Sequence, residues 1–296
     1  METIRFETVH DYSQFYNNET LNPLVNVVDL SRSAPQTSFK MVFDIYCVVL
    51  KQTKCGDLKY GNTFYDYQEG TLVFFAPGQV VEVLNTEMYQ PFGMAIVFHP
   101  DLFLHTSLAQ QMSIYHFFSY NTNEALHLSE KEKSLILDIF DKMKFELQQS
   151  VDKHSKKLIT SHLELLLDYC TRFYDRQFIT RENTNKGILA RFEDLLNNYF
   201  QTDKPQNVGL PSVSFCADEL HLSSNYFGDL IKKETGKSAQ EFIQSKVIDV
   251  AKERIFSIDK SISEVAYELG FKYPQHFTRL FKQRTGMTPI EYKHLN

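Results

Sequence analysis

The chain has 296 residues, a length that predicts two domains more readily than one. Hydrophobic residues make up 43% of it and charged residues 23%, as in an ordinary globular protein, so disorder over most of the length is excluded. The net charge of −6 is unevenly distributed, because residues 204–296 hold 13 basic and 11 acidic residues while the rest of the chain is acidic. The C-terminal third is therefore the better candidate for contact with a polyanion, although its charge alone does not establish such contact.

Missing motifs exclude several classes of protein. No two of the 11 glycines lie one residue apart, so there is no dinucleotide-binding G-x-G-x-x-G loop, and the P-loop-like segment Gly56–Thr63 has Asn62 in place of the lysine. No apolar run approaches the ~18 residues of a membrane span, and the N-terminus lacks the pattern of a secretory signal. The four cysteines have no C-x-x-C spacing, which is typical of reduced thiols in a cytoplasmic protein. The ten histidines contain neither H-x-H nor H-E-x-x-H, so we expect no metal and no other cofactor.

The first hundred residues have the pattern of short β-strands. Strands are predicted at 39–50, 71–75, 79–84 and 92–98, where β-branched and aromatic residues are concentrated. The segment Ala76-Pro77-Gly78 ends the second of them as a turn. Strands at such close spacing, with no helical period between them, predict a small sandwich or barrel.

Two long helices follow. Ser129 and Glu132 form a capping box at the start of the first, in which Ile136, Phe140, Met143 and Leu147 recur at helical spacing. The second helix, at roughly 153–176, carries two adjacent apolar seams, one at 159/163/166/170/173 and one at 158/162/165/169. So broad an apolar surface needs two partners, of which one is the preceding helix and the other is either the rest of the same subunit or a second protomer. The polar stretch 180–186 is predicted to be a linker.

The C-terminal third contains an internal repeat. Residues 213–220 resemble 262–269 with an offset of 49, and residues 227–236 resemble 277–286 with an offset of 50. Each copy has a short helix with a small alanine, a tight turn and an amphipathic helix, which together describe a helix-turn-helix at 213–236 and at 262–286. Between the copies, Ala239–Phe256 fits one helix with Phe242, Val247, Val250 and Ala251 on its inner face. A rod of about 25 Å could hold the two amphipathic helices at successive major grooves of one DNA duplex.

The outward residues of these two helices are the candidate DNA contacts. On the second helix, Gln275 and Arg279 lie one turn apart and suit adenine and guanine, while Thr278 lies between them. Lys272 and Lys282 suit phosphates. The first helix offers the following residues: Ser224, Asn225 and Lys232. Asp229 stands where the second copy has Arg279, and it either accepts from a cytosine amino group or, as we favour, pairs with Lys232 or Lys233 within the helix.

Residues 187–296 resemble the DNA-binding domain of the AraC/XylS family of bacterial transcription regulators. Three motifs in the second copy carry the resemblance: Ala266-x-x-Leu-Gly-Phe271, Phe277-x-Arg-x-Phe-Lys282 and Gly286-Met-Thr-Pro-x-Glu-Tyr292. More weakly, Glu69–Gly78 resembles a turn of the cupin-like sensor domain of this family. The resemblance implies a cytoplasmic homodimer that binds double-stranded promoter or operator DNA, works with RNA polymerase and responds to a small-molecule effector.

The resulting prediction is an α+β protein in three parts. A small cupin-like β-barrel is expected at 1–125, a helical dimerisation segment and linker at 126–183, and an all-α domain with two helix-turn-helix motifs at 184–296. The function expected is that of a ligand-responsive transcription regulator and not of an enzyme. Two alternatives remain: a regulator whose N-terminal domain senses a protein partner, and a cupin enzyme with an appended DNA-binding domain, which the lack of clustered histidines disfavours. No ligand-binding residue is predicted, because a shift of one residue in strand register exchanges inward and outward positions.

Overall fold

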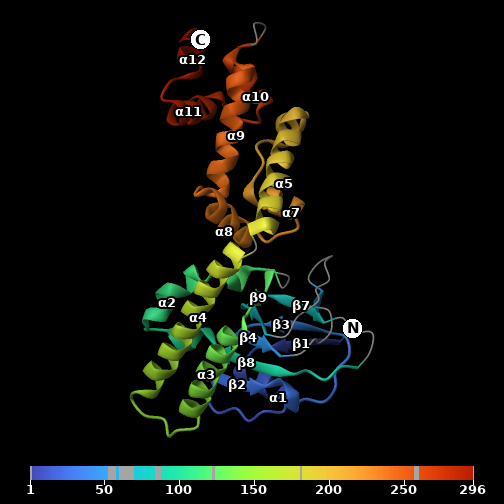
Figure 1. The fold of residues 1–296 in the computed structure, drawn as a ribbon, viewed down its shortest axis with the longest axis vertical. Helices are drawn as coiled ribbons and strands as arrows, with labels where there is room; N and C mark the ends of the chain where they lie inside the picture. Colours follow the sequence, from blue (N-terminus) through green and yellow to red (C-terminus); the bar gives the residue numbers. More distant parts are fainter. Residues whose placement is uncertain are drawn as a thin grey trace. The chain divides into compact units, whose positions relative to one another are not determined.

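We describe a computed structural model of the chain, which covers residues 2–52, 58–59, 70–83, 88–121, 124–180, 182–256 and 260–295. Contacts divide it into two compact units, Met1–Thr180 and Arg181–Asn296, called here the N-terminal unit and the C-terminal unit. The fold is mixed α+β, as predicted: the strands lie in the N-terminal unit, and the described elements of the C-terminal unit are all helices (Figure 1). The P-loop-like segment lies outside the described residues, apart from Leu58 and Lys59.

The N-terminal unit is built on two β-sheets. One has the strand order β1-β3-β7-β5 and the other the order β2-β8-β4-β6-β9. Their strands are β1 Glu2–Phe6, β2 Val25–Asp29, β3 Phe39–Phe43, β4 Tyr46–Lys51, β5 Leu58–Lys59, β6 Thr71–Phe75, β7 Val80–Val83, β8 Gly93–Phe98 and β9 Leu126–His127. Neighbouring strands pair antiparallel, except that β1 runs parallel to β3.

The strand predicted at 39–50 is two strands in different sheets. β3 pairs with β7 in the first sheet, whereas β4 pairs with β6 and β8 in the second. The chain crosses between the sheets at Asp44, whose backbone N–H donates to the Phe6 carbonyl at 2.9 Å and whose carboxylate accepts from Arg5 Nε at 2.7 Å. The sequence did not indicate this break, because the strands on both sides of it are buried and both are therefore apolar.

A short helix, which the sequence patterns did not indicate, lies among the first strands. α1 covers Val9–Phe15 and begins at Thr8, whose side chain and Asp11 form a reciprocal capping box. Tyr12 of this helix stacks edge-on against Phe6 at 4.9 Å between ring centroids. α1 therefore contributes aromatic residues to the same core as the strands.

The main core of this unit lies between the two sheets. Phe43 from β3 and Phe75 from β6 stack with ring centroids 4.7 Å apart and an interplanar angle of 7°. Alternate residues of the strands point into this space, as the two-residue period of a strand requires: Phe39, Met41 and Phe43 from β3, Cys47 and Val49 from β4, and Val73 and Phe75 from β6.

Helices cover the other face of the second sheet. α3 (Glu130–Leu147) packs on α4 (Ser155–Thr180) and on β2, and α4 reaches β9 (Figure 1). Phe74 of β6 contacts Phe117 at 4.4 Å and Tyr174 of α4 at 6.1 Å between ring centroids. The short elements between β8 and β9 are η2 Pro100–Phe103, α2 Ser107–Gln111, η3 Met112–Ile114 and η4 His116–Ser119, and η1 covers Leu30–Arg32. β6 is consequently buried on both faces.

The structure separates the two seams of α4. The capping box of Ser129 and Glu132 is present, and the predicted inner positions of α3 are buried. On α4 the seam 159/163/166/170/173 is buried within the single chain, with Leu163 fully inaccessible. Leu158 and Leu165 of the other seam are 45% and 44% exposed. The option that both seams pack within one subunit is therefore wrong for the second seam.

The predicted linker at 180–186 is mostly helical. α4 continues to Thr180 and α5 begins at Glu182, and the boundary between the two units lies between Thr180 and Arg181. Polar composition suggested a loop there, but Asn185 is buried and its amide donates to Glu234 Oε1 at 3.1 Å. This contact ties the first turns of α5 to α8.

Eight helices make up the described C-terminal unit: α5 Glu182–Gln201, α6 Lys204–Val208, α7 Val213–Glu219, α8 Ser224–Thr235, α9 Ala239–Arg254, α10 Ile262–Glu268, α11 Pro274–Thr285 and α12 Pro289–Leu295. The inner face of α9 is rotated from the prediction. Ile243, Val247 and Ile248 are buried with Ala251, whereas Phe242 and Val250 are only half-buried. None of the described helices combines the length and the apolar composition needed to cross a membrane.

Candidate nucleic-acid interface

The two helix-turn-helix copies have the same turn geometry. In the first, Leu222 N–H donates to the Ala217 carbonyl at 2.9 Å, and in the second Phe271 N–H donates to the Ala266 carbonyl at 3.0 Å. His221 and Gly270 occupy the left-handed position of these turns, with φ of 59° and 95°. Both turns are thus Schellman motifs, in which the free carbonyls of the last helical turn are satisfied.

Each second helix starts directly after its turn. α8 is capped by the Ser223 hydroxyl, which accepts from Tyr226 N–H at 3.2 Å. α11 starts with Pro274 in its first turn, where the missing N–H costs nothing. The connection from the left-handed residue to the N-cap residue is one residue longer in the second copy, and Lys272 lies in it.

Aromatic packing fixes the orientation of both helices. Phe227 of α8 is fully buried and contacts Phe192 of α5 edge-on, with ring centroids 4.9 Å apart. Phe277 and Phe281 of α11 are also fully buried, at 5.7 Å from each other. Because one face of each helix is held in this way, the opposite face is set toward solvent.

The outward face of α11 carries the residues predicted for the second copy. Gln275, Arg279 and Lys282 are exposed, and Thr278 is half-buried with its hydroxyl donating to the Pro274 carbonyl at 3.2 Å. The Lys272 ammonium is exposed and lies 5.7 Å from the centroid of the Tyr273 ring. Gln275, Thr278, Arg279 and Lys282 therefore lie along one face of α11, and Lys272 lies in the turn before it.

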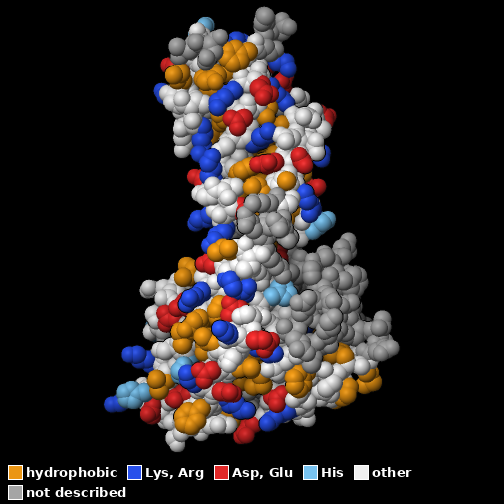
Figure 2. Space-filling model, in the orientation of Figure 1, with side chains coloured by type: hydrophobic (Ala, Val, Ile, Leu, Met, Phe, Trp, Pro, Cys, Tyr) orange, Lys and Arg blue, Asp and Glu red, His pale blue; other side chains and the backbone are white. Residues whose placement is uncertain are grey.

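The outward face of α8 is less basic. Ser224, Asn225 and Lys232 are exposed, and Asp229 is half-buried. Lys and Arg side chains are seen along the edge of the C-terminal unit that carries α8 and α11 (Figure 2). Neither role suggested for Asp229 is tested by this arrangement, so both remain predictions.

α9 connects the two copies. Its 16 residues span about 24 Å at ~1.5 Å per residue. α8 and α11 both pack on α9 and lie toward opposite ends of it (Figure 1). Arg284 at the end of α11 donates to Gln244 Oε1 of α9 at 2.7 Å. This hydrogen bond links α11 to α9. One rigid helix thus sets the spacing of the two outward faces.

The internal repeat extends beyond residues 236 and 286, where the two helix-turn-helix motifs end. Gly236 and Gly286 close α8 and α11 with φ of 72° and 82°. After them, Ser238 caps α9 and Thr288 caps α12, with Glu241 and Glu291 completing each capping box. The two segments share the sequence pattern T-G-x-[ST]-x-x-E at the same offset of 50.

The cap glutamates have a shared electrostatic property. Hydrogen bonds from the backbone N–H of Ser238, Ser261 and Thr288 lower the pKa of Glu241, Glu264 and Glu291 respectively.

The described residues show no sign of a reactive thiol or a metal site. Burial raises the pKa of the Cys47 and Cys216 thiols to about 12, which makes them poor nucleophiles. In the described part of the chain, no three His, Cys, Asp or Glu residues are grouped so that they could hold a metal ion.

Comparison with known proteins gives the class of the C-terminal unit. Residues 216–294 match a family described as a helix-turn-helix domain. An uncharacterized HTH-type transcriptional regulator of Bacillus subtilis, YtdP, is 35% identical over 112 residues, which are 38% of this chain and 14% of YtdP. Another from the same organism, YfiF, is 30% identical over 141 residues, which are 48% of this chain and 41% of YfiF. The C-terminal domain of the response regulator yesN of Fusobacterium nucleatum is 25% identical, with a TM-score of 0.30, covering 34% of this chain and 96% of that domain.

The C-terminal unit contains a helix-turn-helix domain of the AraC type, so the resemblance to the AraC/XylS family is confirmed for this part of the chain. The curated relatives are transcriptional regulators. The chain spans well under half the length of each of these two curated relatives, 14% of YtdP and 41% of YfiF. The matches therefore identify the type of the DNA-binding domain.

Proposed function

We propose that this chain is a sequence-specific DNA-binding transcription regulator that reads two successive major grooves with α8 and α11. The observation that carries the proposal is the duplicated helix-turn-helix, with matched turns and matched outward faces at the two ends of α9. A helix of about 24 Å plus its flanking turns approaches the ~34 Å of one duplex turn. One chain would then bind two half-sites on one face of the DNA.

The residues divide by their chemistry. Gln275 and Arg279 read bases, because both side chains can make bidentate hydrogen bonds to purine edges. Lys272 and Lys282 contact phosphates, and Thr278 packs between the two readers. On α8 the contacts come from Ser224, Asn225 and Lys232, all of which are exposed.

The N-terminal unit would be the sensor. We assign a cupin-like, ligand-binding domain to 1–125, a dimerisation segment to 126–183 and the DNA-binding domain to 184–296. Two facing sheets with an aromatic core support a sensor that can enclose a small molecule, in preference to one that senses a protein partner. Promoter DNA and RNA polymerase are the implied partners in the bacterial cytoplasm.

The active form would be a homodimer joined through α4. The outer seam of α4 supports this, since Leu158 and Leu165 are nearly half exposed at positions one heptad apart. Apolar side chains are visible among charged ones over the helical side of the N-terminal unit (Figure 2). The inner seam, including Leu163, serves the core of the subunit and not the dimer.

Selection of bound sequences from random double-stranded DNA tests the proposal. The full chain should enrich two short motifs with centres about 10–10.5 base pairs apart. A matched chain with Arg279→Ala should lose preference at one position of one motif only. Enrichment of a single motif, or of none, would contradict reading by two helices.

A further inference from the structure

The last residue of α9 connects three helices of the C-terminal unit. Arg254 is half-buried, and its guanidinium donates to the backbone carbonyl of Phe200 in the last turn of α5. The same guanidinium donates to the carbonyl of Glu268, the last residue of α10, at 3.4 Å. The last four carbonyls of a helix have no N–H partner within it, and a cation is favourable at this end of the helix dipole. Arg254 therefore satisfies the C-terminal ends of two helices at once.

The two helices that Arg254 joins belong to different halves of the unit. Phe192 of α5 contacts Phe227 of α8 edge-on, with ring centroids 4.9 Å apart. Tyr199 of α5 contacts Phe215 of α7 in the same way at 5.4 Å. α5 thus packs with both helices of the first helix-turn-helix, whereas α10 is the first helix of the second. Arg254 consequently links the two copies to each other and to the end of the helix that connects them.

A second contact joins the same two halves. The Tyr199 hydroxyl donates to the Gly209 carbonyl at 2.8 Å, in the connection that leads from α6 to α7. Gly209 lies against Gly270, the left-handed residue of the second turn, because a Cβ at Gly270 would lie only 2.7 Å from the Gly209 carbonyl carbon. We call Arg254, Tyr199, Gly209 and Gly270 the brace.

The brace acts on the segment that places α11. Glu268 ends α10, Gly270 forms the turn, and α11 begins at Pro274. A movement at the end of α10 therefore moves the start of α11 and its outward face. α9 sets the distance between the copies, whereas contacts away from its axis, between α5 and α10, set the rotation of one copy relative to the other about α9.

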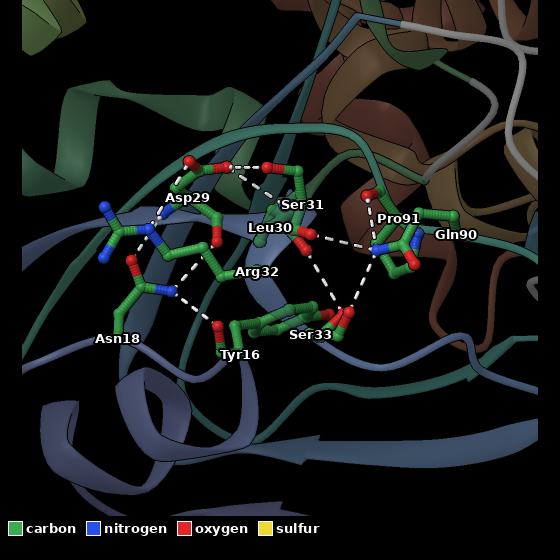
Figure 3. A network of polar contacts seen from close by, with 9 residues as sticks. All are labelled: Tyr16, Asn18, Asp29, Leu30, Ser31, Arg32, Ser33, Gln90 and Pro91. Carbon is green, nitrogen blue, oxygen red and sulfur yellow. Dashed lines mark hydrogen bonds and ion pairs between the residues drawn. The ribbon is translucent and has the colours of Figure 1, made fainter.

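Gln90 of the N-terminal unit shows a simpler bridge of the same chemical kind. Its side-chain amide donates to the carbonyls of Ser31 and Ser33 at 3.1 and 3.0 Å (Figure 3). Both acceptors of Gln90 lie in one short segment, so this bridge fixes the position of a single loop. The acceptors of Arg254 lie in two separate helices, so its bridge sets the relation between structural elements.

We propose that Arg254 is a positioning residue for DNA recognition, which sets the rotation of α11 relative to α8 and thereby the spacing of the half-sites that one chain binds. The proposal rests on the two-groove reading proposed above and adds a residue that does not face the DNA. Arginine suits this role because its planar fork presents several donors in fixed directions, whereas a lysine ammonium is a single point charge. Loss of the guanidinium leaves both outward faces intact but loosens their relative rotation.

The test uses the full chain and duplexes that carry the two selected motifs at centre-to-centre spacings from about 9 to 13 base pairs. Duplexes with a single motif are the reference. One base pair rotates a half-site by about 35°, so the unaltered chain should bind the best spacing about tenfold more tightly than the next. Arg254→Met should reduce this preference to about threefold or less, while affinity for a single motif stays within about twofold.

Three further variants complete the test. Lys252→Met is the matched control on the same helix, because Lys252 pairs with Asp249 of α9 at 3.4 Å, and it should leave the spacing preference unchanged. Arg254→Lys keeps the charge and should restore part of the preference. If Arg254→Met does not fold, Tyr199→Phe removes one hydroxyl of the brace and should weaken the spacing preference in the same direction.

A folded Arg254→Met with an unchanged spacing preference would overturn the proposal. An equal loss of affinity on single and paired motifs would also overturn it, because Arg254 would then contribute to stability alone. The DNA selection on the unaltered chain decides the function separately. Two enriched motifs that are bound alike at every spacing would reject this role while the regulator function stands. Enrichment of no motif would reject the proposed function and this role with it.

Discussion

Arg279 and Asp229 occupy matched positions of the two helix-turn-helix copies, yet they carry opposite charges. Arg279 is exposed on α11, while Asp229 is half-buried on α8. A guanidinium can donate two parallel hydrogen bonds to guanine O6 and N7, whereas a carboxylate near the DNA backbone is repelled by phosphate. The two copies should therefore contribute unequally to DNA affinity.

Arg279→Ala should weaken binding to the specific site by roughly 1–3 kcal/mol and relax preference at one base pair, because the lost contact is to a base. Lys282→Ala should instead weaken all sequences alike and lower the salt dependence by about one phosphate contact. Titration of the cognate site and of scrambled DNA at two salt concentrations measures both effects. Asp229→Ala is the comparison at the matched position and should leave cognate affinity unchanged or raise it. A selective loss of cognate binding in Asp229→Ala would show that α8 reads a base through its acid.

His221 and Gly270 occupy the same left-handed position in the two turns, but this backbone conformation costs more free energy for histidine than for glycine. Both have positive φ, which is free for glycine but costs a residue with a side chain roughly 1–2 kcal/mol. His221→Gly should therefore raise stability, by up to about 1 kcal/mol after the entropy of the added glycine is subtracted. Gly270→Ala should do the reverse, because its Cβ would also lie 2.7–2.9 Å from backbone atoms of residues 205–210. Chemical denaturation of the two variants checks the signs, and a destabilised His221→Gly would mean that the imidazole makes a contact worth more than the strain.

At the scale of elements, sequence patterns predict a helix start correctly where all of the residues that form the pattern lie within a few positions of one another. Ser129 and Glu132, or Ser261 and Glu264, specify a helix start by their own hydrogen bonds, and both capping boxes are present. The strand break at Asp44 and the helical start at Glu182 could not be predicted in this way. Both depend on partners far along the chain: Asp44 on Arg5 and Phe6, and the start of α5 on the bond from Asn185 to Glu234. The rotated face of α9 has the same origin, since tertiary packing selected Ile243 and Ile248 over Phe242 and Val250.

The capping boxes make the C-terminal unit sensitive to acid. Because the folded pKa of Glu264 is lowered from 4.5, its contribution is fully present above that value and is lost as the pH falls through the folded pKa. The unaltered chain should accordingly have a higher Tm than Glu264→Gln at pH 7, and the difference should shrink below about pH 4.5. Glu193→Gln, at an exposed position in the middle of α5, serves as the matched control for the change of glutamate to glutamine. Thermal unfolding followed by circular dichroism at several pH values gives the result, and a constant difference across the range would exclude this linkage.

The two seams of α4 should respond differently to mutation. Leu158→Glu together with Leu165→Glu should convert a dimer into a folded monomer, because both side chains are nearly half exposed in the single chain. Leu163→Ala should leave the oligomeric state unchanged but lower stability by about 2–5 kcal/mol, since it empties a fully buried position. Sedimentation velocity and denaturant unfolding measure the two properties independently. A monomeric unaltered chain at tens of micromolar would reject the dimer outright.

At the scale of the whole molecule, the sequence predicted the order of parts better than the arrangement within them. The internal repeat identified the C-terminal unit and its outward residues, because each copy constrains the interpretation of the other. In the N-terminal unit, the pairing of β1 with β3 and the division into two sheets were not available from composition, since composition does not say which strands pair.

The two units should be separable. The core of the N-terminal unit is drawn from residues 6–125, while the helices of the C-terminal unit close on their own aromatic contacts, such as Phe192 with Phe227 and Phe281 with Tyr292. A fragment of residues 181–296 should therefore fold as an all-helical domain and bind the same DNA motifs as the full chain. It should start at 181 and not at 184, because α5 begins at Glu182 and Asn185 ties it to α8. Circular dichroism and DNA titration check this fragment, and residues 1–180 should give a β-containing spectrum without DNA binding. If the 181–296 fragment folded and bound the two motifs as tightly as the full chain does, the gain expected from linking two protomers through α4 would be absent, and regulation would have to act within a single chain.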